Sequence, residues 1–184
     1  MRTITMLMAV VALLTASAQA VAQTRPGVPT DMENTLYIDL KDGRVVIQMR
    51  PDLAPNHVAQ IKKHARDGKY DGVVFHRVID GFMAQTGDPT GTGSGGIGEP
   101  LKAEFSKEPH VRGTLSMART NDPNSARSQF FICFGDAGFL DGQYTVVGEV
   151  ISGMDVVDKI KAVPTGPGDV PLQPVTIKSA TLEK

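Results

Sequence analysis

Short runs of β-branched and aromatic residues, bounded by glycine or polar turns, recur along most of the chain. The first two lie in "TLYIDLKDGRVVIQM", where Lys41-Asp42-Gly43 separates them and indicates a hairpin. The later runs are "GVVFHRVI", "GFMAQTG", "GTLSMAR", "QFFICF", "YTVVGEV" and "VTIKSATLE". Their lengths and residue types are typical of β-strands.

Two other stretches, "APNHVAQIKKHARDG" and "GMDVVDKIKAV", repeat apolar residues at helical spacing instead. In the first we expect Asn56 to cap the start of the helix and Gly68 to end it. In the second, Pro164 prevents further extension. The aligned apolar positions are Val58, Ile61 and Ala65 in the first stretch, and Met154, Val157 and Ile160 in the second.

Many short strands combined with only two helices favour a closed or nearly closed antiparallel sheet. Two amphipathic helices are the right number to cover the two open ends of a small barrel. We therefore predict a mainly β fold, an antiparallel β-barrel capped by two α-helices.

The first 22 residues have the build of a secretory signal peptide. Arg2 supplies the positive start, residues 6–14 the apolar stretch, and Ala18-Gln19-Ala20 a small-x-small cleavage site. Cleavage after Ala20 or after Ala22 fits this pattern. The alternative is an uncleaved anchor or a buried helix, but the apolar stretch is shorter than the roughly 20 residues of a membrane span. We predict export to the periplasm, with secretion into the medium left open, and no membrane association after cleavage.

The rest of the chain divides into residues 23–34, which we expect to be a flexible arm because they are polar and contain proline, and one domain over residues 35–184. The formal net charge is −1 and no basic cluster stands out, so we expect neither nucleic acid nor an anionic membrane as a partner. The single cysteine, Cys133, excludes an internal disulfide. Its apolar neighbours indicate an inert, buried thiol. We expect a monomer.

The glycine-rich run "GTGSGG" matches the dinucleotide-binding pattern G-x-G-x-x-G through Gly91, Gly93 and Gly96. That pattern binds phosphate only where a strand leads into it and a helix begins on it. Gly98 and Pro100 follow directly and disfavour a helix. We therefore interpret the run as a loop of another kind.

Standard catalytic motifs are absent: there is no H-E-x-x-H, no cysteine pair, and no G-x-S-x-G around Ser94 or Ser152. The histidines are scattered, without the spacing of metal ligands. They are His57, His64, His76 and His110. The sequence predicts neither a metal nor a cofactor.

Arg77 is unusual because it lies inside a predicted strand otherwise made of Val, Phe and Ile. Period-two alternation predicts that it shares a face with Phe75 and Ile79. Taken alone, it could be an arginine that extends from the barrel wall into solvent.

Two strands place an amide beside a large apolar group. Met83 and Gln85 share one face of their strand, and Gln129 and Phe131 share one face of another. Barrel packing alone could also give either pair.

Three blocks of the sequence resemble a known family. "FHRVIDGFMAQTGDPTGTGSGG", "GTLSMARTNDPNSARSQFFICF" and "FLDGQYTVVGEV" are similar, in order, to the signature blocks of cyclophilins, the peptidyl-prolyl cis/trans isomerases. The resemblance extends from about Leu36 to Leu182. It implies an eight-stranded antiparallel β-barrel closed by two helices, and it places the glycine run in the flexible loop beside the substrate groove.

The resemblance also implies roles for individual residues. Arg77 would be the catalytic arginine, and Gln85 would help to hold Arg77 and the substrate backbone. Ala118 and Arg119 would bind peptide main chain, with Gln129 on the same rim. The walls of the proline pocket would be Phe82, Met83, Phe131 and Leu140.

The sequence departs from the family pattern at three places. Many members have Asn where this chain has Arg119, which puts a side-chain role there in doubt. Phe139 and Tyr144 stand where eukaryotic members often have Trp and His, as in the bacterial exported branch. Since Phe139 has no indole N–H, we expect weak binding of cyclosporin A but largely unchanged turnover.

The expected function is isomerisation of Xaa-Pro bonds in unfolded or loop segments of exported proteins. Proline-containing polypeptides would be its partners. Two alternatives remain: a proline-peptide binding module without useful turnover, and a general chaperone that holds unfolded chains.

Overall fold

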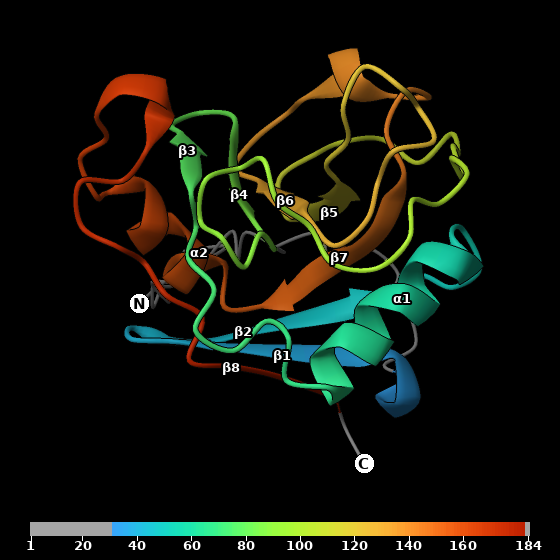
Figure 1. The fold of residues 1–184 in the computed structure, drawn as a ribbon, viewed down its shortest axis with the longest axis horizontal. Helices are drawn as coiled ribbons and strands as arrows, with labels where there is room; N and C mark the ends of the chain where they lie inside the picture. The colour runs from blue at the N-terminus through green and yellow to red at the C-terminus, as the bar shows by residue number, and fades with distance from the viewer. Residues whose placement is uncertain (1–30, 183–184) are drawn as a thin grey trace, which may run out of the picture.

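The computed structural model describes residues 31–182, and within them eight antiparallel strands form one strongly curled sheet (Figure 1). The strands are β1 (Thr35–Leu40), β2 (Gly43–Met49), β3 (Arg77–Ile79), β4 (Met83–Thr86), β5 (Thr114–Met117), β6 (Phe130–Cys133), β7 (Val146–Ser152) and β8 (Ser179–Leu182). Two α-helices, α1 (Pro55–Arg66) and α2 (Met154–Lys161), and three short 3₁₀ turns, η1 (Met32–Asn34), η2 (Gly138–Leu140) and η3 (Pro167–Asp169), complete the fold. The mainly β prediction with eight strands and two helices is confirmed.

The sheet is curled rather than fully closed, so the prediction of a closed barrel was too strong. The strand order is β3-β4-β6-β5-β7-β2-β1-β8, and the edge strands β3 and β8 do not pair with each other. An isolated bridge between Val74 and Thr176 lies across the gap. The N–H of Phe75 donates to the carbonyl of Val175, and the N–H of Ile177 donates to the carbonyl of Val73, both at 2.9 Å.

This gap explains why two strands are shorter than predicted. In "GVVFHRVI" only Arg77–Ile79 joins the main ladder, and in "VTIKSATLE" only Ser179–Leu182 does. The first halves of both segments bond to each other across the gap. Their change of partner also breaks the expected alternation, since Phe75 lies in the barrel core while Arg77 is exposed.

The helices bury the faces that their spacing predicts. Val58, Ile61 and Ala65 of α1 are buried, as are Val157 and Ile160 of α2, whereas Met154 is only partly buried. In the structure α1 contacts β8, and α2 contacts β2 and β3.

The predicted start of α1 was wrong and its predicted end was right. Ala54 occupies the capping position, and Asn56 lies within the first turn because Pro55 is the first helical residue. Glu104 performs the cap from outside the helix, accepting from the N–H groups of Asn56 (3.2 Å) and His57 (3.1 Å). Gly68 follows the helix with φ +64°, a left-handed conformation that suits glycine.

The predicted signal peptide, residues 1–22, and most of the predicted arm lie outside the described residues. Within the arm, Asp31 precedes η1 and its carboxylate accepts from the N–H of Glu33. Gln48 of β2 accepts from the N–H of Asp31 at 3.1 Å and donates to the carbonyl of Asn34 at 3.1 Å. Residues 31–34 are therefore hydrogen-bonded to the sheet. None of the helices within residues 31–182 is long and apolar enough to cross a bilayer.

Alternation along β4 and β6 divides their side chains between two apolar clusters. Ala84, Phe130 and Ile132 point into the main core of the barrel. Met83 and Phe131 point the other way, into a smaller cluster with Cys133, Ala137 and Leu140. Burial raises the pKa of the Cys133 thiol to about 12, as expected for an inert cysteine. The smaller cluster forms the floor of the candidate site.

Candidate active site

A pocket of about 190 Å³ lies over the smaller cluster and is lined by most of the predicted site residues. The lining residues are Arg77, Phe82, Met83, Gln85, Ala118, Arg119, Phe131, Leu140 and Tyr144. Strand register brings the central ones together: Arg77 of β3 is opposite Gln85 of β4, which is opposite Phe131 of β6. Side chains at opposed positions lie on the same face, so the three form one row across the sheet.

The floor of this pocket is apolar and closely packed. Met83, Phe131 and Leu140 are buried, with exposed fractions of 2%, 4% and 7%. The ring of Phe131 meets the ring of Tyr144 edge-on at 6.0 Å. On another side it stacks on the ring of His110 at 6.3 Å.

His110 is a buried support for Phe131 that the sequence reasoning did not assign. Its Nδ1 donates to the carboxylate of Asp141 at 2.9 Å, and its Nε2 lies 2.9 Å from Oγ of Ser116. Hydrogen bonds from the backbone N–H and ring of His110 lower the pKa of Asp141. These contacts fix the imidazole plane on which Phe131 stacks.

Arg77 lies at the open side of the pocket and is 45% exposed in its side chain. Its Nε donates to Oδ2 of Asp169, in η3, at 3.3 Å. Gln85 lies opposite Arg77 but donates its amide to Oε1 of Gln129 at 2.8 Å. The contact that holds Arg77 in this structure is therefore with Asp169 rather than with Gln85.

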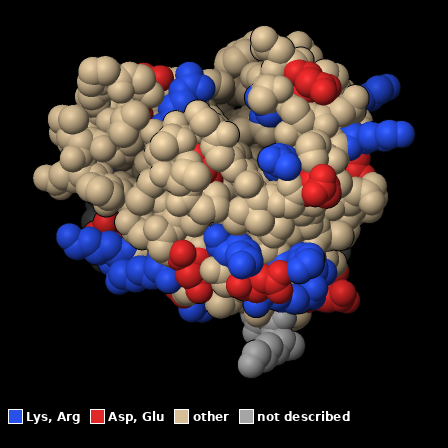
Figure 2. Space-filling model, viewed as in Figure 1, with Lys and Arg blue, Asp and Glu red and all other residues tan. Residues whose placement is uncertain are grey.

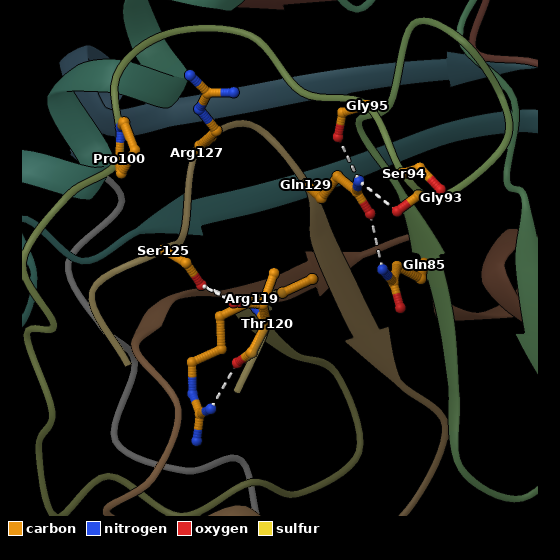
Figure 3. A pocket seen from close by; sticks show the side chains of 11 residues that line it. Gln85, Gly93, Ser94, Gly95, Pro100, Arg119, Thr120, Ser125, Arg127 and Gln129 are labelled. Atoms are coloured by element: carbon orange, nitrogen blue, oxygen red, sulfur yellow. Dashed lines mark hydrogen bonds between the residues drawn. The ribbon is translucent and has the colours of Figure 1, made fainter. Parts of the chain in front are cut away.

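A second, larger pocket of about 720 Å³ adjoins the first and shares Gln85, Ala118 and Arg119 with it. Its other walls are Gly93, Ser94, Gly95, Pro100, Thr120, Ser125, Arg127 and Gln129 (Figure 3). The amide of Gln129 contacts Gln85, which lines both pockets, and donates to the carbonyls of Gly93 (3.0 Å) and Gly95 (2.6 Å) in the second pocket. Gln129 thus lines the second pocket and not the first.

The glycine run borders the second pocket, and it does not form a phosphate site. The buried carboxylate of Asp88 accepts from the N–H groups of Thr90 (2.8 Å), Gly93 (2.7 Å) and Gly95 (3.0 Å). These are the amides that an anionic ligand would need. Burial acts to raise the pKa of Asp88, but these hydrogen bonds outweigh it and lower the pKa. A Cβ at Gly95 would collide with the Asp88 carboxylate, which explains a glycine there.

Arg119 lines both pockets, and its side chain is bound to the protein itself. Its guanidinium stacks on the ring of Tyr144, with Cζ 4.4 Å from the ring centroid. Nε and Nη2 donate to the carbonyl of Gln143 at 3.1 and 3.0 Å, and Nη1 donates to that of Thr120 at 2.8 Å. All of these interactions are within the protein, so the side chain acts here as a structural brace.

Phe139 is the predicted residue that lies outside both pockets. It is 66% exposed, and its ring lies 5.2 Å from that of Phe82. It therefore extends the apolar rim beyond Phe82.

The surface of the molecule is hollowed near the top of the view in Figure 2. Acidic and basic side chains alternate along the lower edge of this face.

The sequence match agrees with this geometry. Residues 35–182 match the model of the cyclophilin-type peptidyl-prolyl cis-trans isomerases. A probable peptidyl-prolyl cis-trans isomerase of Brucella suis is 57% identical over 165 residues, which cover 83% of this chain and 84% of that protein.

Solved structures give the same result. A cyclophilin-type isomerase of Cryptosporidium parvum, crystallised in the presence of the dipeptide Ala-Pro, aligns with a TM-score of 0.78 at 29% identity. The alignment covers 82% of this chain and 99% of that one. A cyclophilin of Hirschia baltica aligns with a TM-score of 0.73 at 32% identity, covering 83% and 75% of the two chains.

The curled eight-stranded sheet, the family match and the solved structures agree on a cyclophilin-like protein. This chain belongs to the cyclophilin family. Its activity is accordingly that of a peptidyl-prolyl cis-trans isomerase.

Asp169 and His110 are the two residues at this site that the sequence reasoning missed. Asp169 lies 92 positions from Arg77, in a Pro-Gly turn that signals only a loop. His110 lies in a segment without strand or helix periodicity. No local pattern could connect either residue to the pocket.

Proposed function

We propose that this isomerase holds the proline ring of its substrate on Met83, Phe131 and Leu140 while Arg77 stabilises the twisted peptide bond. One observation carries the proposal: a guanidinium lines the same small pocket as three buried apolar side chains. The apolar groups suit a pyrrolidine ring, and the cation lines the same pocket, where we propose that it acts on that ring's nitrogen.

The chemistry requires no covalent intermediate. Rotation about a peptide bond is slow because the nitrogen lone pair is delocalised into the carbonyl, which gives a barrier of roughly 18–20 kcal/mol. In the twisted state the proline nitrogen is pyramidal and its lone pair can accept a hydrogen bond. A donor placed at that nitrogen binds the transition state more strongly than either ground state, which is the condition for catalysis.

Arginine suits this task because its guanidinium stays charged and offers several donors in one fixed plane. With Nε bound to Asp169, the two terminal amino groups remain for the substrate. An acceleration of about 10⁵ needs about 7 kcal/mol of selective stabilisation, because each tenfold gain needs about 1.4 kcal/mol. A charged hydrogen bond and a well-oriented substrate can together supply this.

The peptide on either side of the proline would follow the groove between the two pockets. Gln85, Ala118 and Arg119 line both pockets, and Gln129 lines the second. Main-chain contacts at Arg119 would be retained despite the change from Asn, because the arginine side chain is bound to the protein itself.

The substrates we propose are unfolded or loop prolines of exported proteins in the periplasm. The signal-peptide pattern of residues 1–22 supports this location. We also propose weak binding of cyclosporin A, since Phe139 at the rim offers no indole N–H.

The experiment is NMR exchange spectroscopy on a short Ala-Pro peptide with the wild type, Arg77→Ala and Arg77→Lys. The proposal expects fast cis/trans exchange with the wild type and strongly reduced exchange with both variants. Lysine should not restore the rate, because a point charge lacks the planar fork. Saturable peptide binding without exchange in the wild type would instead indicate a binding module.

A further inference from the structure

Within residues 31–182, the side chain of Arg77 has a single hydrogen-bonding partner, Asp169. The distance from Nε to Oδ2 is 3.3 Å, and the two side chains are 45% and 44% exposed. Arg77 is on β3 and Asp169 on η3, two elements that are in contact although far apart in sequence (Figure 1).

Backbone hydrogen bonds within the loop that carries Asp169 close it on itself. The N–H of Gly166 donates to the carbonyl of Val170, and the N–H of Leu172 to that of Pro164, both at 2.8 Å. At its end, Thr165 and Pro171 form an isolated bridge. The carboxylate is thus presented to Arg77 from a closed loop.

Asp169 has an unfavourable backbone conformation. Its φ of +60° makes it the one residue other than glycine with positive φ among residues 31–182. Asp and Asn tolerate this left-handed region better than other side chains do, but glycine adopts it with no penalty. An aspartate at a position suited to glycine points to a use for its side chain.

The geometry identifies that use. A guanidinium is planar, so an acceptor at Nε restricts the direction of both terminal amino groups. Neither of those groups has a hydrogen-bonding partner within the described part of the chain. Gln85, the neighbour across the strand pair, is bound to Gln129 instead. Asp169 is therefore placed to set the orientation of the catalytic cation.

We propose that Asp169 is a positioning residue for Arg77: it binds Nε so that the terminal amino groups face the proline pocket. The inference rests on the proposed catalytic role of Arg77. Half-exposed ion pairs contribute little to folding stability, so the main effect of Asp169 is on the rate.

Two substitutions distinguish the effect of the Asp169 carboxylate from the effect of the loop backbone. Asp169→Asn keeps shape and left-handed tolerance but removes the charge, and Asp169→Gly removes the side chain while keeping the backbone conformation. We expect kcat/KM to fall about 3- to 10-fold for Asn and further for Gly, because small misplacements of a catalytic group are costly. The loss should be mainly in kcat, with KM and the urea midpoint of unfolding nearly unchanged.

Asp80→Asn is the matched control. Asp80 follows β3 and lies 3.9 Å from Lys161, so the variant removes an equal charge near the site without touching Arg77. It should keep wild-type kcat. A similar loss in this variant would mean that Asp169 acts only through its long-range charge, and would overturn the proposal.

A double-mutant cycle tests whether Asp169 acts through Arg77. In the Arg77→Ala background, measured at raised enzyme concentration, Asp169→Asn should change the residual exchange rate by less than about 1.5-fold. The ¹⁵N signal of Arg77 Nε should also shift in the single variant Asp169→Asn. An unchanged or increased kcat for Asp169→Asn, with Arg77→Ala impaired, would refute the positioning role alone. A near-normal rate for Arg77→Ala would refute the proposed function itself.

Discussion

The floor of the proline pocket and the loops that border the two pockets, here called the rim, are built in different ways. Met83 and Phe131 come from adjacent paired strands, so alternation and register fix their direction. Asp169, Arg119 and the glycine run come from loops, and side-chain to backbone hydrogen bonds hold the latter two in place. We infer that the floor contributes more to stability and to ring binding, whereas the rim contributes less to stability and mainly affects rate and specificity.

The sharpest test of the floor is Phe131→Ala. Removing a buried aromatic ring should cost about 3–5 kcal/mol of unfolding free energy, and the loss of the ring-binding surface should raise KM strongly. Urea denaturation and peptide exchange measure the two effects. If stability were unchanged, Phe131 would belong with the rim rather than the floor. Phe139→Ala, at an exposed position on the rim, is the matched control and should leave stability within about 0.5 kcal/mol.

Asp88 should show the strongest stabilising interaction of the rim. Asp88→Asn removes the charge that accepts three backbone N–H groups of the glycine run, and should cost about 1–3 kcal/mol. Asp42→Asn, in the exposed β1–β2 turn, is the control at pH 7.

The pH dependence of stability gives a second test of Asp88. Because the folded protein lowers the pKa of Asp88 below its ordinary 3.8, the carboxylate stabilises the fold above pH 4. This contribution should decline as the pH falls from about 4 through the lower folded value, and Asp88→Asn should lose less stability than the wild type over that range. Parallel pH profiles for the two proteins would contradict the role of the charge.

Arg119→Asn, which introduces the residue common elsewhere in the family, should have a smaller effect. It removes the cation–π contact with Tyr144, worth about 0.5–1 kcal/mol, and the hydrogen bonds to Gln143 and Thr120. We expect KM to rise less than about fivefold with kcat retained, since the side chain braces the wall and does not act on the substrate. A large fall in kcat would show a direct catalytic role.

Phe139→Trp should change peptide turnover least of all. An indole N–H at the rim should strengthen binding of cyclosporin A, measurable by isothermal titration, while exchange of Ala-Pro stays within about twofold because Phe139 lies outside the proline pocket. Unchanged cyclosporin affinity would mean that the weak binding we propose has another cause.

The difference between the floor and the rim also explains which features the sequence could predict. Alternation alone placed Met83 beside Gln85 and put Phe130 and Phe131 on opposite faces, and the structure agrees. Alternation gave the wrong face for Phe75, because the chain before β3 forms backbone hydrogen bonds with residues 175–177 across the gap in the sheet. A period-two pattern does not reveal such a change of partner.

The contacts of the rim were beyond prediction for a related reason. Loop hydrogen bonds such as Arg77 to Asp169 join distant positions through turns whose geometry depends on the whole fold. The strand pattern singled out Arg77, but only the family resemblance assigned catalytic and pocket-wall roles to it and its neighbours. It gave no indication of Asp169 or of the stacking of His110 on Phe131.

The central claim is that Arg77 lowers the rotational barrier at the proline bound on this floor. The most direct measurement is kcat/KM for an Ala-Pro peptide with the wild type and Arg77→Ala, with unfolding midpoints measured on the same samples. The account predicts a loss on the order of 10²- to 10³-fold, as for removal of one charge-stabilising donor at an active site, with the midpoint unchanged. An Arg77→Ala variant that folds normally and exchanges the peptide within a few-fold of the wild-type rate would contradict it.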